Sequence, residues 1–364
     1  MKFSRGRRFE AWRVLFLALA FAALATQLAC QSRRIQSQNL PAQPIALLYW
    51  EHKAESFRAE SFKNASQLPP RPLNNVDSEA AQALEIRAYL QAEKNMMLSS
   101  RLARHSGHLM LYWPRTEKLE RVEAAPANSR PLAWSPDHRR LLFVSAHRNS
   151  RDQLYEYDLE RRDLLALTFG PAEHVRGDYD GRGRLVIQRI VRSRRRVAPL
   201  QTVHLATADG RIGREIARDV HPGTLRFGFE GDRVFYEQVR PRPRSDGPTV
   251  FESFVATRAV AEGSEEQILV RGREPSLTPD GQWIVFASPS SAGYRLRRMR
   301  PDGTLRVPIG PGGTGERMPT VSPDGAYVAF IQEVSGSRRL SVRGFDGKSE
   351  RVLLTSGWAE FPVW

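Results

Sequence analysis

A short turn motif recurs along the chain, and this repetition constrains the fold more than any other feature. The tripeptide Ser-Pro-Asp or Thr-Pro-Asp occurs three times, and an apolar segment rich in β-branched and aromatic residues follows each copy. In such a motif Pro fixes φ, Asp bonds its own backbone and Gly supplies a positive φ, so we predict tight hairpin turns. His138 takes the Gly position of the first copy, and we expect it to adopt the same backbone at some strain. The turn residues are Pro136, Asp137, Pro279, Asp280, Gly281, Pro323, Asp324 and Gly325.

A second turn follows 22 residues after the first in the two best copies, at Asp302-Gly303 and Asp346-Gly347. Two degraded copies of the first turn, around residues 179–181 and 229–231, also precede apolar segments. Each unit therefore contains four short strands, which we name A to D in chain order, with the first turn between A and B and the second between C and D. Four-stranded units of about 40–50 residues are typical of β-propellers.

Counting the units predicts a closed ring. Five complete units begin near residues 131, 174, 224, 274 and 317, and the segment 360–364 is a further A strand. Candidate B, C and D strands for it lie at 45–50, 108–113 and 118–123. We therefore predict an all-β, six-bladed β-propeller over residues 44–364, closed by N- and C-terminal strands in one blade. Residues 52–107 interrupt that blade, and their composition predicts a helical insertion with a helix over 78–102.

The first 29 residues have the pattern of a signal peptide. A basic segment precedes the apolar run 14–25, which is too short to span a bilayer comfortably and ends in small residues. The sequence Gln27-Leu28-Ala29-Cys30 then resembles a bacterial lipobox, so we expect lipidation at Cys30, a linker over 30–43, and an outer-membrane lipoprotein facing the periplasm. Ordinary cleavage after Ala25 is the alternative. Cys30 is the single cysteine, which excludes an internal disulfide and a thiolate zinc site.

The Trp-Ser-Pro-Asp and Ser-Pro-Asp-Gly repeats resemble those of TolB-type propellers, a WD40-like family. The resemblance is strongest over residues 270–364 and 130–170. It implies a non-enzymatic, monomeric scaffold that binds envelope proteins or cell-wall components, with a peptidoglycan-associated lipoprotein or Tol components as expected partners. Only about 14 residues separate Cys30 from the first predicted strand, so we expect the separate α/β domain of TolB to be absent. The alternative is a carbohydrate-binding or polysaccharide-cleaving propeller that uses residues at its central channel.

Arginine-rich segments mark one rim of the predicted ring. Strand alternation places all B–C and D–A connections on the same rim, and two B–C connections are rich in arginine. We predict a basic surface for an acidic partner; the alternative is a set of solvated loops in a chain of net charge +15. Export argues against nucleic acid as the partner. The residues of this predicted surface are Arg192, Arg194, Arg195, Arg196, Arg240, Arg242 and Arg244.

Enzyme and metal signatures are weak. The chain contains no Gly-x-Ser-x-Gly elbow and no His-Glu-x-x-His helix motif. Asp178-Tyr179-Asp180 begins like a calcium loop, but Arg182 stands at a ligand position, so we interpret this segment as a blade turn. The eight histidines show no ligand spacing. We therefore expect no catalytic residue, no metal and no cofactor.

Overall fold

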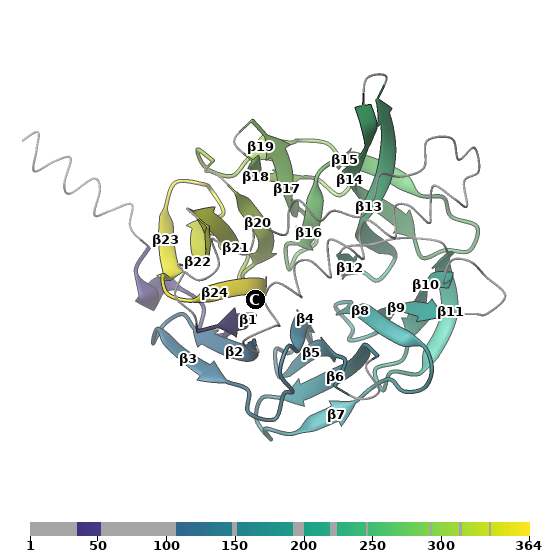
Figure 1. Cartoon of the computed structure of the whole chain (residues 1–364), viewed down its shortest axis with the longest axis horizontal. Coiled ribbons are helices and arrows are strands. Elements are labelled where there is room, and N and C mark those ends of the chain that lie inside the picture. Colours follow the sequence, from purple (N-terminus) through teal and green to yellow (C-terminus); the bar gives the residue numbers. More distant parts are fainter. Residues whose placement is uncertain are drawn as a thin grey trace, which may run out of the picture.

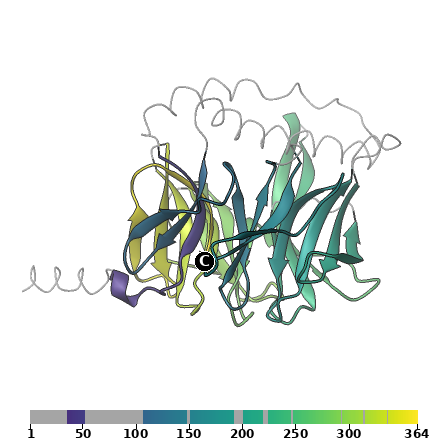
Figure 2. The ribbon, with the colours of Figure 1, turned by 90° about the horizontal axis from the view of Figure 1, so that it is seen from below.

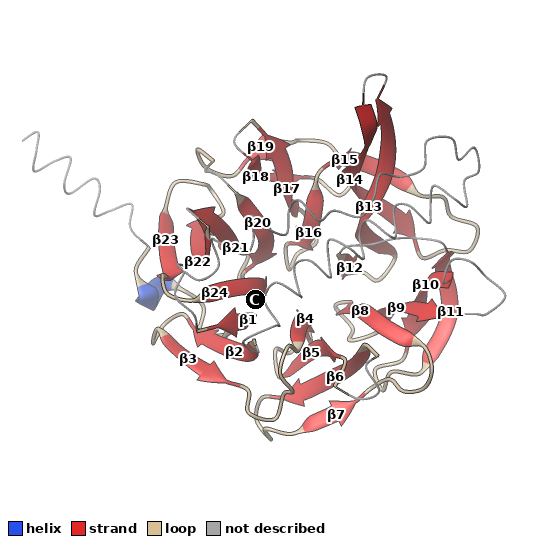
Figure 3. Ribbon diagram, in the orientation of Figure 1, coloured by secondary structure: helices blue, strands red, loops and turns tan. Residues whose placement is uncertain are grey.

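The structure is a computed structural model that describes residues 35–51, 107–147, 151–191, 200–218, 224–244, 247–291, 293–312, 315–334 and 336–364. Almost all regular structure in this part is β-strand, with one short 3-10 helix, η1 (Ser37–Asn39) (Figure 3). None of its helices is long and apolar enough to cross a membrane. The predicted signal peptide over 1–29, Cys30 and the predicted helix over 78–102 lie outside the described residues.

The strands form six antiparallel four-stranded sheets, which are arranged as blades around a central axis (Figure 1). In blades one to five the four strands follow one another in sequence, and the A strand lies nearest the axis. Blades one to three consist of β4 (Arg130–Trp134), β5 (Arg140–Ser145), β6 (Gln153–Asp158), β7 (Leu164–Ala166); β8 (Glu173–Tyr179), β9 (Leu185–Val191), β10 (Leu200–Ala206), β11 (Ile212–Arg218); and β12 (Leu225–Phe227), β13 (Arg233–Arg244), β14 (Gly247–Ala259), β15 (Gln267–Arg271). Blades four and five consist of β16 (Arg273–Leu277), β17 (Ile284–Ser290), β18 (Gly293–Met299), β19 (Val307–Pro308); and β20 (Glu316–Val321), β21 (Tyr327–Val334), β22 (Ser337–Gly344), β23 (Glu350–Leu354).

The sixth blade, which we call the closing blade, joins distant parts of the chain. Its strands are β24 (Trp358–Val363), β1 (Ile45–Trp50), β2 (His108–Trp113) and β3 (Lys118–Arg121), in that spatial order. β1 pairs antiparallel with β24, with Trp50 opposite Trp358 and Ala46 opposite Val363. The predicted six blades and their closure by N- and C-terminal strands are confirmed.

The core is divided among the blade interfaces. A separate apolar cluster lies between each pair of neighbouring blades, including the pair formed by the closing blade and blade one. Both faces of a blade are therefore covered, which explains why the B strands are continuous apolar runs without polar alternation. Leu141, Leu142, Phe143 and Val144 of β5 are all fully buried. Because every interface buries apolar side chains, we expect the ring to unfold as one unit.

The predicted turns have the expected geometry. Gly281 and Gly325 have φ values of 68° and 71° in the A–B turns, and Gly303 and Gly347 have 86° and 78° in the C–D turns. In blade four, Asp280 Oδ1 accepts a 3.0 Å hydrogen bond from Gln282 N. His138 has φ of 55°, so it occupies the left-handed conformation that the sequence predicted.

One prediction about the B–C connections is wrong. The arginine-proline segment of blade three is not a loop, because β13 and β14 continue through it as a long hairpin that pairs Arg240 with Glu252 and Arg242 with Val250. This arm rises above the rest of the ribbon on one face of the disc (Figure 2). Trp283 comes just before β17, where an aromatic residue of a B strand is expected in the core, but its ring is only half-buried. The guanidinium groups of Arg298 and Arg300 lie 4.9 and 4.3 Å from its centroid.

Candidate functional site at the mouth of the central channel

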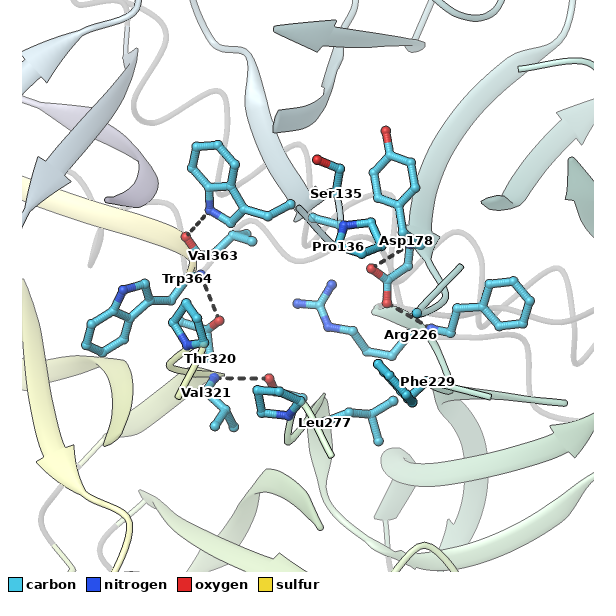
Figure 4. A pocket seen from close by; sticks show the side chains of 18 of the residues that line it. Ser135, Pro136, Asp178, Arg226, Phe229, Leu277, Thr320, Val321, Val363 and Trp364 are labelled. Atoms are coloured by element: carbon cyan, nitrogen blue, oxygen red, sulfur yellow. Dashed lines mark hydrogen bonds between the residues drawn. The ribbon is translucent and has the colours of Figure 1, made fainter. Parts of the chain in front are cut away.

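The A strands line a cavity on the axis, at the face that carries the A–B turns, and one lining residue of each strand takes an equivalent position (Figure 4). In blades one to five this residue stands two positions before the first residue of the turn, so the period of a β-strand directs it to the axis. The cavity has a volume of about 220 Å³. The six residues of this ring, which we call the axial ring, are Ala133, Asp178, Arg226, Ser276, Thr320 and Val363.

Polar members of the axial ring also tie neighbouring blades together. Asp178 Oδ2 accepts a 2.8 Å hydrogen bond from Phe227 N of the next A strand. Ser276 Oγ accepts one of 3.4 Å from Val321 N, and Thr320 Oγ1 accepts one of 3.0 Å from Trp364 N. The ring therefore satisfies backbone donors that would otherwise face the channel unpaired.

Arg226 provides the positive charge of the site. Its side chain extends into the middle of the channel mouth (Figure 4), and its Nη1 donates a 2.8 Å hydrogen bond to the Leu132 carbonyl of blade one. Arg226 belongs to blade three, so the contact reaches past blade two. Arg226 forms no ion pair with any residue that the structure describes. A guanidinium with five donors keeps capacity for an anionic or carbonyl group of a ligand.

Asp178, on β8 of blade two, has a raised pKa. Burial raises the pKa of its carboxyl to about 6, although the charge of Arg226 and hydrogen bonds from Phe227 N and Tyr179 N oppose that shift. The side chain touches the cavity, but protein surrounds it on the other sides. Near neutral pH this carboxyl changes charge with modest changes in its surroundings.

The rim of the mouth is apolar. Pro136, Pro279 and Pro323 of the A–B turns line it, and in blade three Phe229 takes the place of the proline. The Phe229 side chain is 50% exposed. His138 lies beside this rim; burial lowers its pKa, and its Nδ1 is buried without a hydrogen-bond partner among the described residues. The apolar rim, with the Arg226 guanidinium at its centre and the Asp178 carboxyl in its wall, suits an extended segment with an acidic group and apolar side chains.

The predicted arginine surface is only partly described. Arg240 pairs with Glu266 at 2.6 Å and Arg242 with Glu252 at 3.1 Å, so part of its charge is neutralised within blade three. Arg244 ends β13. The structure does not describe the segment with Arg192, Arg194, Arg195 and Arg196, so that surface stays a prediction.

The calcium-like segment at Asp178 has another structural role, and so does a glycine-rich segment later in the chain. Asp178 and Asp180 do not form a cation loop, because Asp180 accepts a 2.6 Å hydrogen bond from Arg184 while Asp178 binds Phe227 N. Within the described residues, no group of three or more His, Cys, Asp or Glu is placed to hold a metal. Gly310, Gly312 and Gly315 have the spacing of a phosphate loop, but the residues described between β19 and β20 form no helix whose N-terminus could hold a phosphate.

Solved structures support the fold. TolB from Acinetobacter baumannii matches with a TM-score of 0.57 and 17% identity, over 80% of this chain and 74% of that one. A putative TolB from Agrobacterium tumefaciens matches with a TM-score of 0.51 and 22% identity, over 67% and 87% of the two chains. A chain of a nidogen/laminin complex matches with a TM-score of 0.51 and 11% identity, over 71% and 94%. No protein-family profile and no curated protein matches. The likeness of the repeats to TolB-type propellers is thereby confirmed as a likeness of fold.

Proposed function

We propose that this chain is a non-enzymatic propeller scaffold of the bacterial envelope, exported and held at the outer membrane through Cys30, that binds a segment of an envelope protein at the channel mouth. The single observation that carries the proposal is Arg226, a cation without a described ion-pair partner at the centre of an apolar rim. A rigid ring that presents such a site is a typical platform for peptide recognition.

The site also limits what can bind. A cavity of about 220 Å³ admits a few side chains and not a folded domain. The rim offers proline and phenylalanine surfaces, and the centre offers a guanidinium. We therefore expect the partner to insert a short segment with an acidic side chain between apolar ones. A peptidoglycan-associated lipoprotein or another Tol component is the first partner to look for, since the TolB-like fold supports an envelope role in integrity or assembly.

Site-specific cross-linking in cells tests this proposal. A photoreactive p-benzoylphenylalanine replaces Phe229 at the channel mouth, and the matched control replaces Phe169, which is 68% exposed but does not line the cavity. We expect a discrete protein adduct from position 229 only, with a yield that falls when Arg226→Gln is added. Cys30→Ser should reduce the same adduct, because the protein would lose its membrane anchor.

Two outcomes would count against the proposal. Equal adducts from both positions would show nonspecific exposure of the surface. A saccharide adduct from position 229 without a protein would favour the carbohydrate-binding alternative.

A further inference from the structure

A second cavity lies on the opposite face, between blades three and four. It has a volume of about 330 Å³, and the ends of the B strands, the starts of the C strands and the D–A junctions line it. Three arginines reach it from different strands: Arg271 from β15, Arg273 from β16 and Arg317 from β20.

Carboxylates beside the cavity hold the three guanidinium groups, and one of them, Glu252, also lines it. Arg317 Nη2 lies 2.6 Å from Glu274 Oε1, Arg273 Nη2 lies 3.3 Å from Glu237 Oε1, and Arg271 Nη2 lies 3.1 Å from Glu252 Oε1. Burial alone would raise the pKa of Glu274, but Arg317 and Arg273 lower it to about 2, so it stays ionised.

Three glutamates (237, 252 and 274) balance the charge of the three arginines that line the cavity. Glu252 also pairs with Arg242, which lies outside the cavity. The cavity wall therefore offers directed guanidinium donors without a large excess of charge.

Tyr294 fixes two of the arginines. The guanidinium carbons of Arg273 and Arg317 lie 5.7 and 5.5 Å from its ring centroid. Cation–π contacts of this kind limit the movement of both guanidinium planes. Arg317 Nε is buried and has no hydrogen-bond partner among the described residues. A preorganised set of guanidinium donors is suited to a planar or tetrahedral oxyanion.

We propose that this cavity binds a small organic anion whose carboxylate or phosphate lies against Arg271, Arg273 and Arg317. Its volume is in the range of small-molecule sites, so it has room for an organic body beside the anionic group. Val239, Pro289 and the Tyr294 ring provide the apolar surface for that body. This site is separate from the channel mouth and does not depend on the function proposed for it.

Ligand titration at constant ionic strength tests the proposal. Thermal unfolding of the full chain is followed against glucuronate, glucose 6-phosphate and uncharged glucose, which share a sugar body and differ in the anionic group. We expect a saturable stabilisation by glucuronate, by glucose 6-phosphate or by both, and none by glucose. The two anions separate a carboxylate site from a phosphate site.

A pair of variants locates the binding. Arg271 and Arg242 each contact Glu252 Oε1 at 3.1 Å and are 53% and 66% exposed, but only Arg271 lines the cavity. Arg271→Gln should weaken the affinity about tenfold or more, since it removes a charged hydrogen-bond donor, whereas Arg242→Gln should leave it within about twofold. Absence of saturable stabilisation by both anions, or equal losses in the two variants, would overturn the proposal.

Discussion

Thr320 Oγ1 on β20 accepts a 3.0 Å hydrogen bond from Trp364 N, which follows β24, so the fifth blade binds the closing blade directly at the channel wall. The same tryptophan donates from Nε1 to the Gln43 carbonyl at 3.1 Å, before β1. Trp364 is 5% exposed and belongs to the apolar cluster between these two blades. One residue thus joins three separate segments where the ring closes.

Deleting residues 361–364 should therefore destabilise the whole ring. Removal of a buried tryptophan alone costs about 3–5 kcal/mol, and the deletion also removes part of the β1–β24 ladder. We expect a lower midpoint of a single cooperative thermal transition, followed by circular dichroism. Trp283→Ala, which truncates a half-buried ring on the outer surface, should lower it less. Unchanged unfolding of the deletion variant would contradict the observed closure.

A buried ion pair within blade five also bonds to the backbone of blade four, where Arg343 Nη1 donates to the Ile309 carbonyl at 2.9 Å. Arg343 Nη2 lies 2.6 Å from Glu316 Oε1, both side chains are almost fully buried, and Glu316 Oε2 also accepts a hydrogen bond from Leu296 N. Glu316→Leu leaves the buried guanidinium with the part-exposed Glu350 as its described carboxylate partner, so we expect a loss of about 3–5 kcal/mol in the free energy of unfolding.

Adding Arg343→Met should recover much of that loss, because it removes the uncompensated charge. Urea unfolding of both single variants and the double variant gives the coupling energy of the pair. Additive losses would show that the two side chains do not stabilise each other.

Acid should lower the free energy of unfolding because it protonates Glu274. Its pKa is about 2 in the folded state, against 4.5 for an ordinary glutamate, because Arg317 and Arg273 outweigh the effect of burial. The stabilisation is present above pH 4.5 and is lost as the pH falls toward 2; it amounts to about 3 kcal/mol. Glu274→Gln should lower stability at pH 7 and flatten the decline between pH 5 and 2.5, as measured by urea unfolding.

In the control Glu230→Gln, which changes an exposed glutamate, the free energy of unfolding should fall between pH 5 and 2.5 as it does in the wild type. If the free energy of unfolding of Glu274→Gln falls with pH as steeply as that of the wild type, the stabilisation does not come from ionised Glu274.

The blades could be predicted from the sequence because their signals are local. Pro, Asp and Gly act within four residues, so Pro323, Asp324 and Gly325 determine their turn wherever the blade lies in the ring. Continuous apolar B strands follow from burial on both faces. The closing blade could also be predicted, because β24 lacks its B, C and D strands in sequence.

The arm of blade three and the axial ring could not be predicted from the sequence, for physical reasons. β13 pairs with β12 only over Val234 to Tyr236, so Pro241 and Pro243 stand where β13 has no further described partner on that edge, and a strand tolerates them. Arg226 lies in a degraded repeat. Bulges in the A strands, such as the one between Arg273 and Ser276, also shift the alternation of side chains. The residue that faces the axis therefore cannot be found by counting along the strand.

His138 offers a test of the turn motif. It has φ of 55°, which costs a non-glycine residue about 1 kcal/mol, and its buried Nδ1 lacks a described partner. His138→Gly should therefore raise the free energy of unfolding by about 1 kcal/mol. The reverse control is Gly325→Ala: a Cβ there meets only Pro279 Cδ at 3.9 Å, so its expected loss comes from φ alone. Destabilisation by His138→Gly would show that the imidazole contributes more than the strain costs.

Asp178 should make the channel mouth sensitive to pH near neutrality. Burial raises its pKa from 3.8 to about 6, so the folded protein holds this proton more tightly than the unfolded chain does. The ionised carboxyl therefore destabilises the fold, and about 3 kcal/mol should be lost as the pH rises from 4 to beyond 6. Asp178→Asn keeps an acceptor for Phe227 N without the charge, so it should be more stable than the wild type at pH 8 and similar at pH 4. Urea unfolding at both pH values measures this difference, and a difference independent of pH would contradict it. In Arg226→Gln the pKa of Asp178 should rise further, because the opposing positive charge is gone.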